Sequence, residues 1–108
     1  MANFNRDVEC PITTTLEFIG GRWKAVILHY LSSDKRRFGE ISVRIPIISR
    51  KVLSQQLKEL ERDGLIKRKQ YNEIPPRVEY SLTEFGKSLS PVFREMVIWG
   101  KKNSFKKR

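Results

Sequence analysis

The chain has few of the residues from which disulfides, metal centres and catalytic sites are built. Its 108 residues include one cysteine, Cys10, and one histidine, His29. A single cysteine excludes a disulfide within one chain and a zinc site made of several cysteines. His29 has no second histidine or cysteine nearby in the sequence, so it is better explained by packing than by metal ligation. We therefore expect neither a metal nor a cofactor.

Long apolar runs and recognisable catalytic groups are also missing. No stretch is long enough and apolar enough to cross a bilayer, and the N-terminus lacks the basic, apolar and small-residue layout of a signal peptide. We therefore expect a cytoplasmic protein with no membrane partner. The sequence contains no Ser/His/Asp arrangement, no plausible catalytic carboxylate pair and no phosphate-binding glycine loop, which argues against an enzyme.

Positive charge is what the sequence has in excess. Lysine and arginine total 22 residues against 12 acidic ones, a net charge of +10. Each phosphate that a protein neutralises releases counterions, so such a charge favours a polyanionic partner. Charge alone does not choose between DNA, RNA and an anionic membrane. The length predicts one domain, residues 1–108, with a single core.

Residues 49–63 predict an amphipathic helix. Leu53, Leu57 and Leu60 recur at the spacing of one helix face, and Gly64 follows as a stop signal. Ser49 suits the N-cap, because its hydroxyl accepts from a first-turn amide. Away from the leucines lie side chains that can bond to base edges in a major groove, and we take as candidate DNA contacts Ser49, Arg50, Lys51, Ser54, Gln55 and Lys58. The alternative is a surface helix that lysine and arginine only solvate.

The segments around this helix favour DNA. Residues 38–45 predict a short helix that ends before Pro46, and two short helices joined by a few residues match a helix-turn-helix, at about 38–63. Residues 65–71 and 77–83 predict the two strands of a hairpin. In the second of them Val78, Tyr80 and Leu82 alternate with polar residues, and 72–76 supplies the turn. The predicted fold is mainly α with a small β-hairpin, a winged helix-turn-helix whose wing spans about 65–83.

Two basic clusters flank the predicted helix. The wing carries Lys67, Arg68, Lys69 and Arg77, and the charged loop at 32–37 carries Lys35, Arg36 and Arg37. Phosphates or a minor groove would attract the wing cations, and the loop cations would anchor the protein on the DNA backbone. The alternative for the wing is an edge hairpin that its lysines protect from pairing.

The terminal segments predict a dimer. Gly20-Gly21 separates two N-terminal helices, and residues 84–103 form a long helix that Pro91 should bend or split at Ser90. The apolar stripe of this helix exceeds what one core needs, so we assign to a dimer interface Leu89, Phe93, Met96 and Trp99. A two-fold dimer would place its recognition helices about 34 Å apart, or further apart if the wings lie between them, and would bind an inverted repeat. The alternative is a monomer whose last helix folds back on its own core.

Several motifs resemble the HxlR-type bacterial transcriptional regulators. They are Cys10-Pro11, Gly20-Gly-Arg-Trp-Lys24, Arg37-Phe38, Ile48-Ser49, the run from Leu53 to Leu60, Asp63-Gly-Leu-Ile66, and Pro75-Pro76 followed by Val78-Glu-Tyr-Ser-Leu-Thr83. The resemblance extends from Cys10 to Trp99. The helix and hairpin are shared with other groups such as the MarR type, whereas the glycine-tryptophan and proline-proline motifs are specific. The resemblance implies a homodimer, joined through its terminal helices, that represses or activates promoters.

Cys10 is a candidate redox sensor through the same resemblance. In several members of the family a cysteine at this N-terminal position senses oxidants or electrophiles. Proline favours the first helical position, so Cys10 would cap the helix, where the dipole favours a thiolate. Asp7 and Glu9 act against a thiolate through their charge. A structural thiol, buried as a small apolar group, is the alternative.

Two functional hypotheses follow. In the first, the protein is a sequence-specific transcriptional regulator that binds double-stranded DNA as a homodimer and responds to oxidants through Cys10. In the second, it is a winged-helix protein that binds DNA or RNA without sequence preference and has no sensing role. Affinity for a selected site against random duplex and RNA separates the two.

Overall fold

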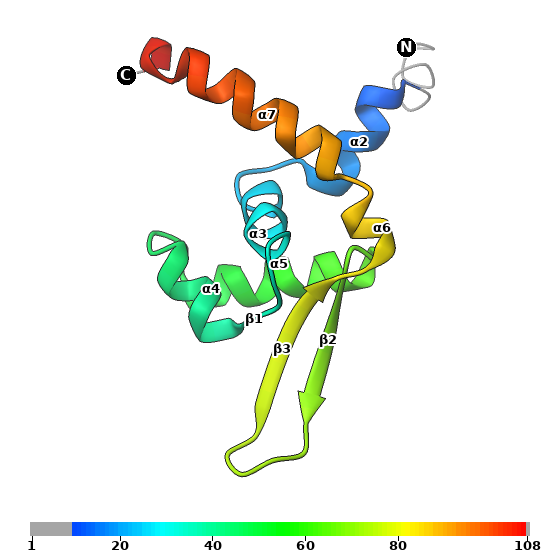
Figure 1. Cartoon of the computed structure of the whole chain (residues 1–108), viewed down its shortest axis with the longest axis vertical. Helices are drawn as coiled ribbons and strands as arrows, with labels where there is room; N and C mark the ends of the chain where they lie inside the picture. The colour runs from blue at the N-terminus through cyan, green and yellow to red at the C-terminus, as the bar shows by residue number, and fades with distance from the viewer. Residues whose placement is uncertain (1–9, 108) are drawn as a thin grey trace.

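A computed structural model describes residues 10–107, with only the backbone of Phe105 and Lys107. The chain forms helices and short strands around one core (Figure 1). In chain order the elements are α2 (Pro11–Ile19), α3 (Lys24–Leu31), β1 (Arg36–Arg37), α4 (Phe38–Arg44), α5 (Arg50–Arg62), β2 (Ile66–Tyr71), β3 (Arg77–Leu82), α6 (Glu84–Lys87), α7 (Ser90–Asn103) and the 3₁₀ helix η1 (Ser104–Lys107).

The predicted fold class is confirmed, with one strand more than expected. The antiparallel sheet is three-stranded in the order β1-β3-β2. Segment 32–37 was expected to be a loop, but its last two residues form β1, where Arg36 pairs with Tyr80 and Arg37 with Glu79. Two residues are too few to show an alternating pattern, which is why the sequence did not predict this strand.

The wing consists of β2, β3 and the loop 72–76 between them. The core forms where α3, α4 and α5 meet the base of this wing. The leucine face of α5 is fully buried there. The buried cluster also takes one residue each from α2 and α7, and its members are Ile19, Ile27, Leu28, Leu31, Ile41, Ile45, Ile48, Leu53, Leu57, Leu60, Leu65, Ile66, Leu82 and Phe93. Beyond Ile66 and Leu82 the wing leaves the body of the protein and extends away from it (Figure 1).

Capping contacts and a glycine mark the ends of α4 and α5, the two helices of the helix-turn-helix. The Ser49 hydroxyl accepts from the Val52 amide at 3.1 Å and caps α5, as the sequence predicted. Gly64, with φ of 79°, occupies the left-handed region just past the other end of α5. In α4 the Glu40 carboxylate accepts from the Arg37 amide at 2.8 Å, and the helix ends before Ile45 and Pro46.

The long C-terminal helix is split into α6 and α7. The break falls at Ser88 and Leu89, just before the Ser90 position expected from Pro91. Pro91 lies in the first turn of α7, where a missing amide donor costs no helical hydrogen bond. Phe93, predicted for a dimer interface, is instead 4% exposed and packs in the core of its own chain, because the first turns of α7 lie against α3.

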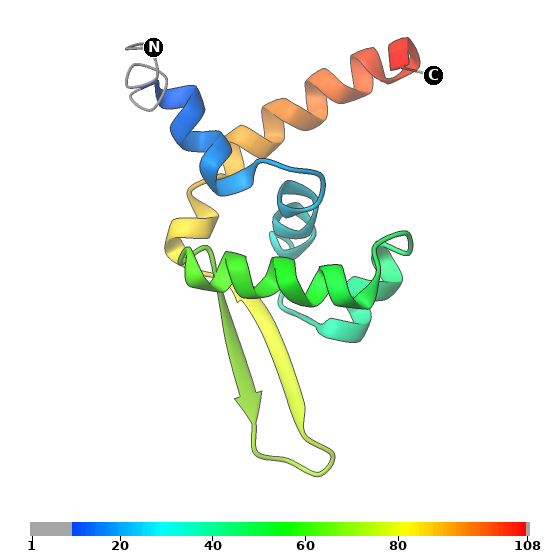
Figure 2. The same cartoon turned by 180° about the vertical axis from the view of Figure 1, so that it is seen from behind.

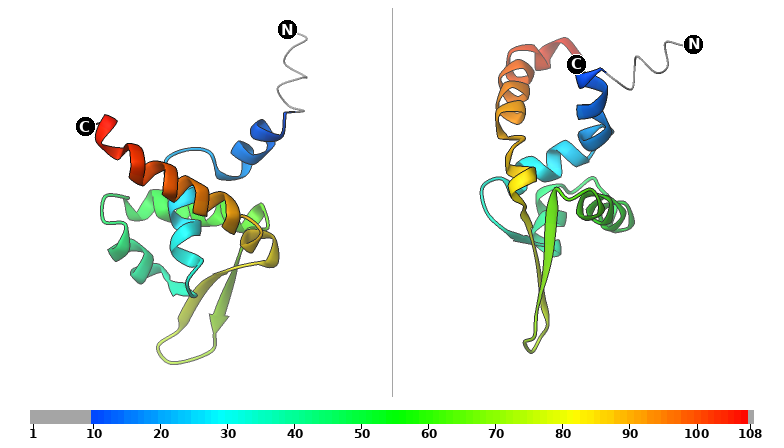
Figure 3. Two further views of the ribbon diagram at one scale, coloured as in Figure 1. Left: turned by 45° about the horizontal axis from the view of Figure 1, so that its top comes forward. Right: turned by 90° about the vertical axis from the view of Figure 1, so that its right-hand side faces the viewer.

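The two ends of the molecule carry different elements. α2 and α7 diverge at the end opposite the wing tip, as the two opposite views show (Figures 1 and 2). In two further views, α2 and α7 again lie at the end of the molecule opposite the wing tip (Figure 3). The wing tip and the terminal helices therefore lie at opposite ends of the molecule. None of the helices in residues 10–107 combines the length and apolar composition that a bilayer crossing requires.

Candidate nucleic-acid interface

Helix α5 turns its polar face away from the protein. Leu53, Leu57 and Leu60 are buried, while the predicted contacts Ser49, Arg50, Lys51, Gln55 and Lys58 are exposed and Ser54 is half-buried. Figure 2 shows α5 at the surface along its whole length. The structure therefore gathers the six predicted helix residues on one accessible element. Its width and hydrogen-bonding groups suit a major groove.

Neighbouring side chains orient part of this face. The Arg50 guanidinium lies 4.8 Å from the centre of the Phe38 ring in α4, so a cation–π contact links the two helices of the helix-turn-helix. The Gln55 amide is 3.5 Å from the Glu59 carboxylate, a contact too long to hold it firmly. Gln55 therefore remains available to a base edge.

An ion pair that the sequence analysis missed fixes α5 against α3. Lys24 Nζ lies 2.7 Å from Glu59 Oε1, and both side chains are largely buried. The hydrogen bond and charge of Lys24 lower the pKa of Glu59, so the Glu59 carboxylate stays ionised at neutral pH. Its partners belong to different helices and are distant in the chain, so no local pattern could have revealed the pair.

The wing cations differ in how closely other side chains hold them. Lys67 and Lys69 are exposed on the strand at the sheet edge, and Lys69 Nζ lies 4.9 Å from the centre of the Tyr71 ring. Arg77, by contrast, is 3.3 Å from Glu73 and 3.5 Å from Glu79, and lies over the Tyr71 ring at 4.0 Å. These contacts brace the wing, so DNA would have to compete with two carboxylates for Arg77. Lys67 and Lys69 remain the stronger candidates for phosphate contacts.

Strand β1 brings part of the predicted loop cluster beside the wing. Arg37 pairs with Glu79, whose other sheet neighbour is Lys69, so the three share one row of the sheet. Arg36 points back to the body, with its guanidinium 4.6 Å from the Tyr30 ring centre and 3.0 Å from the Ser33 hydroxyl. Lys35 is exposed in the preceding loop. Arg37 therefore joins the wing cations, whereas Arg36 supports the fold.

Cys10 occupies the N-cap position of helix α2, as predicted from Pro11, and its side chain makes no capping hydrogen bond. Its backbone is extended and the side chain is half-buried. The nearby backbone amides of Thr13 and Ile12 lower the pKa of the thiol, because unpaired amides at a helix N-terminus stabilise a thiolate. Asp7 and Glu9, which would oppose this effect, lie outside the described residues. The described environment therefore favours a reactive cysteine.

The apolar face of α7 is open where it leaves the core. Met96 and Trp99 are 48% and 69% exposed, and Leu89 is half-buried beside the core. Helix α2 adds Ile12 and Leu16, at 69% and 56% exposure, which were not predicted from the sequence to lie at an interface.

His29 packs against an aromatic ring, with its ring centre 6.4 Å from that of Phe93. The residues from 10 to 107 contain no group of three metal-ligating side chains.

Comparison with known proteins agrees with this arrangement. The model of the HxlR-like helix-turn-helix family matches residues 18–108. The chain belongs to that family. The HTH-type transcriptional regulator YdeP of Bacillus subtilis is 52% identical to this HxlR-like chain over 93 residues, which cover 86% of the chain and 73% of YdeP.

Solved structures give the same fold. The oxidised form of the redox regulator HypR has a TM-score of 0.84 and 45% identity, over 87% of this chain and 97% of HypR. The reduced form of the transcriptional regulator YodB from B. subtilis has a TM-score of 0.76 and 40% identity, over 86% and 92% of the two chains. YodB is also similar in its quinone-bound form. This HxlR-like protein is thus a winged-helix transcriptional regulator and not an enzyme.

We expect the Cys10 thiol to react with iodoacetamide at a lower pH in the folded protein than in the unfolded chain. The thiolate is the nucleophile, and the folded pKa is lowered by the amides of the α2 N-terminus. The midpoint of the rise of the alkylation rate with pH should therefore lie at a lower pH in the folded protein. Rates measured against pH, with and without concentrated urea, test this. Coincident midpoints would contradict it.

Proposed function

We propose that this protein binds an inverted-repeat operator as a homodimer, with one α5 in each of two successive major grooves, and that modification of Cys10 changes its affinity for that operator. The observation that carries the proposal is the exposed face of α5. Arg50, Lys51, Gln55 and Lys58 are exposed on the side away from the buried leucines. A helix held in this way presents a fixed set of donors and acceptors to DNA.

Charge supports the DNA partner. The net charge of +10 is accompanied by Lys67, Lys69 and Arg37 on the elements beside α5. Such cations add affinity for any duplex through phosphate contacts, whereas the α5 side chains add preference for a sequence. A protein that only coats DNA or binds RNA would use the same charge without needing an ordered polar face on α5.

The exposed apolar residues support a dimer. Val92, Met96, Ile98 and Trp99 lie on α7, and Ile12 and Leu16 lie on α2. Large apolar side chains are seldom left exposed together on a helix of a monomer. Because α2 and α7 stand away from the wing, two chains can join there while both α5 helices remain open to DNA.

The cap position and the relatives support sensing by Cys10. The thiol is half-buried and its pKa is lowered, and similar structures include an oxidised redox regulator and a quinone-bound regulator. Since each chain has one cysteine, a disulfide must join Cys10 of two subunits or Cys10 and a small thiol. Two thiols then lose two electrons and two protons, which an oxidant such as diamide accepts. A quinone instead adds to one thiolate.

We predict that Gln55→Ala weakens binding to the operator by roughly 1 to 3 kcal/mol and lowers preference at one base pair. The matched control Gln70→Ala, an exposed glutamine on the wing, should leave that preference intact. Lys69→Ala should weaken binding to all duplexes alike. It should also lower the slope of log affinity against log salt concentration by about one, because one phosphate contact is lost.

The measurement uses a site selected from random DNA and compares it with random duplex and single-stranded RNA. At about 150 mM salt the wild type should prefer its site by on the order of a thousandfold or more. A ratio near one would favour the non-specific alternative. Equal weakening of every sequence by Gln55→Ala would show that the recognition face is misplaced.

We predict that Trp99→Glu converts the dimer into monomers, because the charge enters an otherwise apolar contact and is costly to desolvate. Sedimentation velocity measures the change. Val43→Glu is the control, since Val43 is also an exposed apolar residue but lies on α4, away from the terminal helices. Dimers that persist in Trp99→Glu would place the interface elsewhere.

We predict that diamide and a quinone change operator affinity in the wild type and leave Cys10→Ser unaffected. Electrophoresis without reductant distinguishes the products, because an intersubunit disulfide doubles the mass of the band and a mixed disulfide does not. A Cys10→Ser protein that responded like the wild type would remove Cys10 as the sensor.

A further inference from the structure

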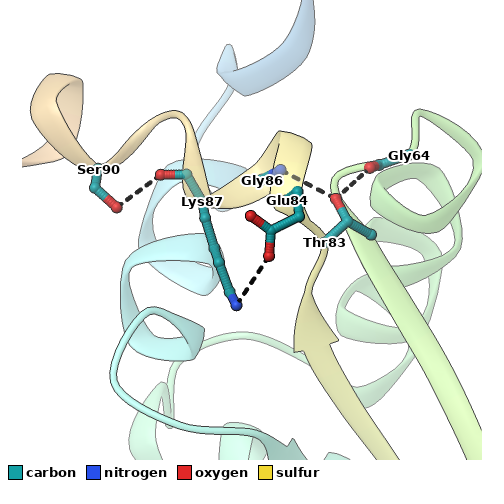
Figure 4. A network of polar contacts seen from close by, with 6 residues as sticks. All are labelled: Gly64, Thr83, Glu84, Gly86, Lys87 and Ser90. Carbon is teal, nitrogen blue, oxygen red and sulfur yellow. Dashed lines mark hydrogen bonds and ion pairs between the residues drawn. The ribbon is translucent and has the colours of Figure 1, made fainter.

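Three parts of the fold meet at the hydroxyl of Thr83. Its Oγ1 donates to the carbonyl of Gly64 at 2.6 Å and accepts from the amide of Gly86 at 3.0 Å (Figure 4). Gly64 follows the last turn of α5, and Gly86 lies in α6. Thr83 itself follows β3, the second strand of the wing. One side chain therefore connects the recognition helix, the wing and the helix that leads to α7.

The backbones at this junction touch without side chains between them. Gly86 is buried, and a Cβ at its position would overlap the carbonyl oxygen of Leu65. The Thr83 amide also donates to that oxygen, at 3.1 Å. Close contact between backbones leaves little room for α6 to shift relative to the end of α5. Glycine at 86 is thus required by the contact itself.

The connection continues into α7. Across the break, the Ser88 amide donates to the carbonyl of Glu84 and the Leu89 amide to that of Gly86, both at 3.1 Å. The Ser90 hydroxyl donates to the Lys87 carbonyl at 2.8 Å (Figure 4). Helices α6 and α7, residues 84–103, are therefore coupled as one unit, which we call the arm. The arm is thus attached at Thr83 to the end of α5 and the wing, and at Phe93 to the core.

We propose that Thr83 is a positioning residue that fixes the angle between α5 and the arm and thereby sets the half-site spacing that the dimer accepts. This inference rests on the proposed function, in which the arm joins two subunits and α5 contacts DNA. Each base pair added between half-sites moves the second groove by about 3.4 Å and rotates it by about 34°. A rigid junction matches one spacing, whereas a loosened junction adapts to several.

Variants of Thr83 separate its two hydrogen bonds. Thr83→Val removes both, and Thr83→Ser keeps both. Thr83→Asp keeps the helix cap to Gly86 but cannot donate to Gly64, because a carboxylate only accepts. The matched control is Thr15→Val, since the Thr15 hydroxyl donates to the Pro11 carbonyl at 2.9 Å within α2 alone. Sedimentation and circular dichroism check that each variant is a folded dimer.

The experiment measures the affinity of each protein for duplexes that carry two copies of the selected half-site at spacings varied by single base pairs. For the wild type, one base pair away from the best spacing should weaken binding on the order of tenfold, a loss comparable to one mismatched base pair. In Thr83→Val and Thr83→Asp that penalty should fall to about threefold or less, while affinity for a single half-site stays unchanged. Thr83→Ser and Thr15→Val should keep the wild-type profile.

The outcomes that overturn the inference are distinct from those that overturn the proposed function. Folded, dimeric Thr83→Val and Thr83→Asp with the wild-type spacing profile would show that Thr83 does not set the angle. Unfolding of both variants would show that the residue maintains the fold rather than a position. A wild type without sequence preference, or without dimers, would instead remove the proposed function before any variant is compared.

Discussion

The orientation of α5 depends on the burial of one row of leucines. Leu53, Leu57 and Leu60 are almost completely excluded from solvent, and loss of one such side chain costs about 2 to 5 kcal/mol. Rotating the helix by one residue, about 100°, would expose leucine and bury polar groups in its place. The core therefore determines which side chains of α5 face outward, although none of those side chains takes part in it.

Polar contacts fix the tilt of α5, which apolar burial alone does not determine. The hydrophobic effect depends on area and does not distinguish among small tilts of a helix. The pair Lys24–Glu59 and the hydroxyl of Thr83 each join groups at one defined distance and angle. One lies along α5 and the other at its end. Together they hold the helix against α3 and against the wing base, in the orientation that its leucines permit.

The sequence predicted the elements whose signals repeat along the chain. Periodic leucines, a serine cap and glycine after the last turn were enough for α5. Alternation along β3 and the turn at 72–76 were enough to predict the hairpin of β2 and β3. Strand β1 was missed because two residues carry no period. The roles of Phe93 and Arg77 also differed from expectation. A helical stripe shows that a residue is buried but not by which surface, and a positive charge does not show which carboxylates lie beside it.

Helix α7 belongs to two environments along its length. Phe93, near its start, packs in the core of the chain, whereas Trp99, two turns further, is largely exposed. In a lone chain the outer turns keep their backbone hydrogen bonds but gain little from packing, so they fray first. In the proposed assembly the same turns gain stability from the second chain, and their order rises with protein concentration. In that assembly, the occupancy of the operator would follow the abundance of the protein, independently of any chemistry at its cysteine.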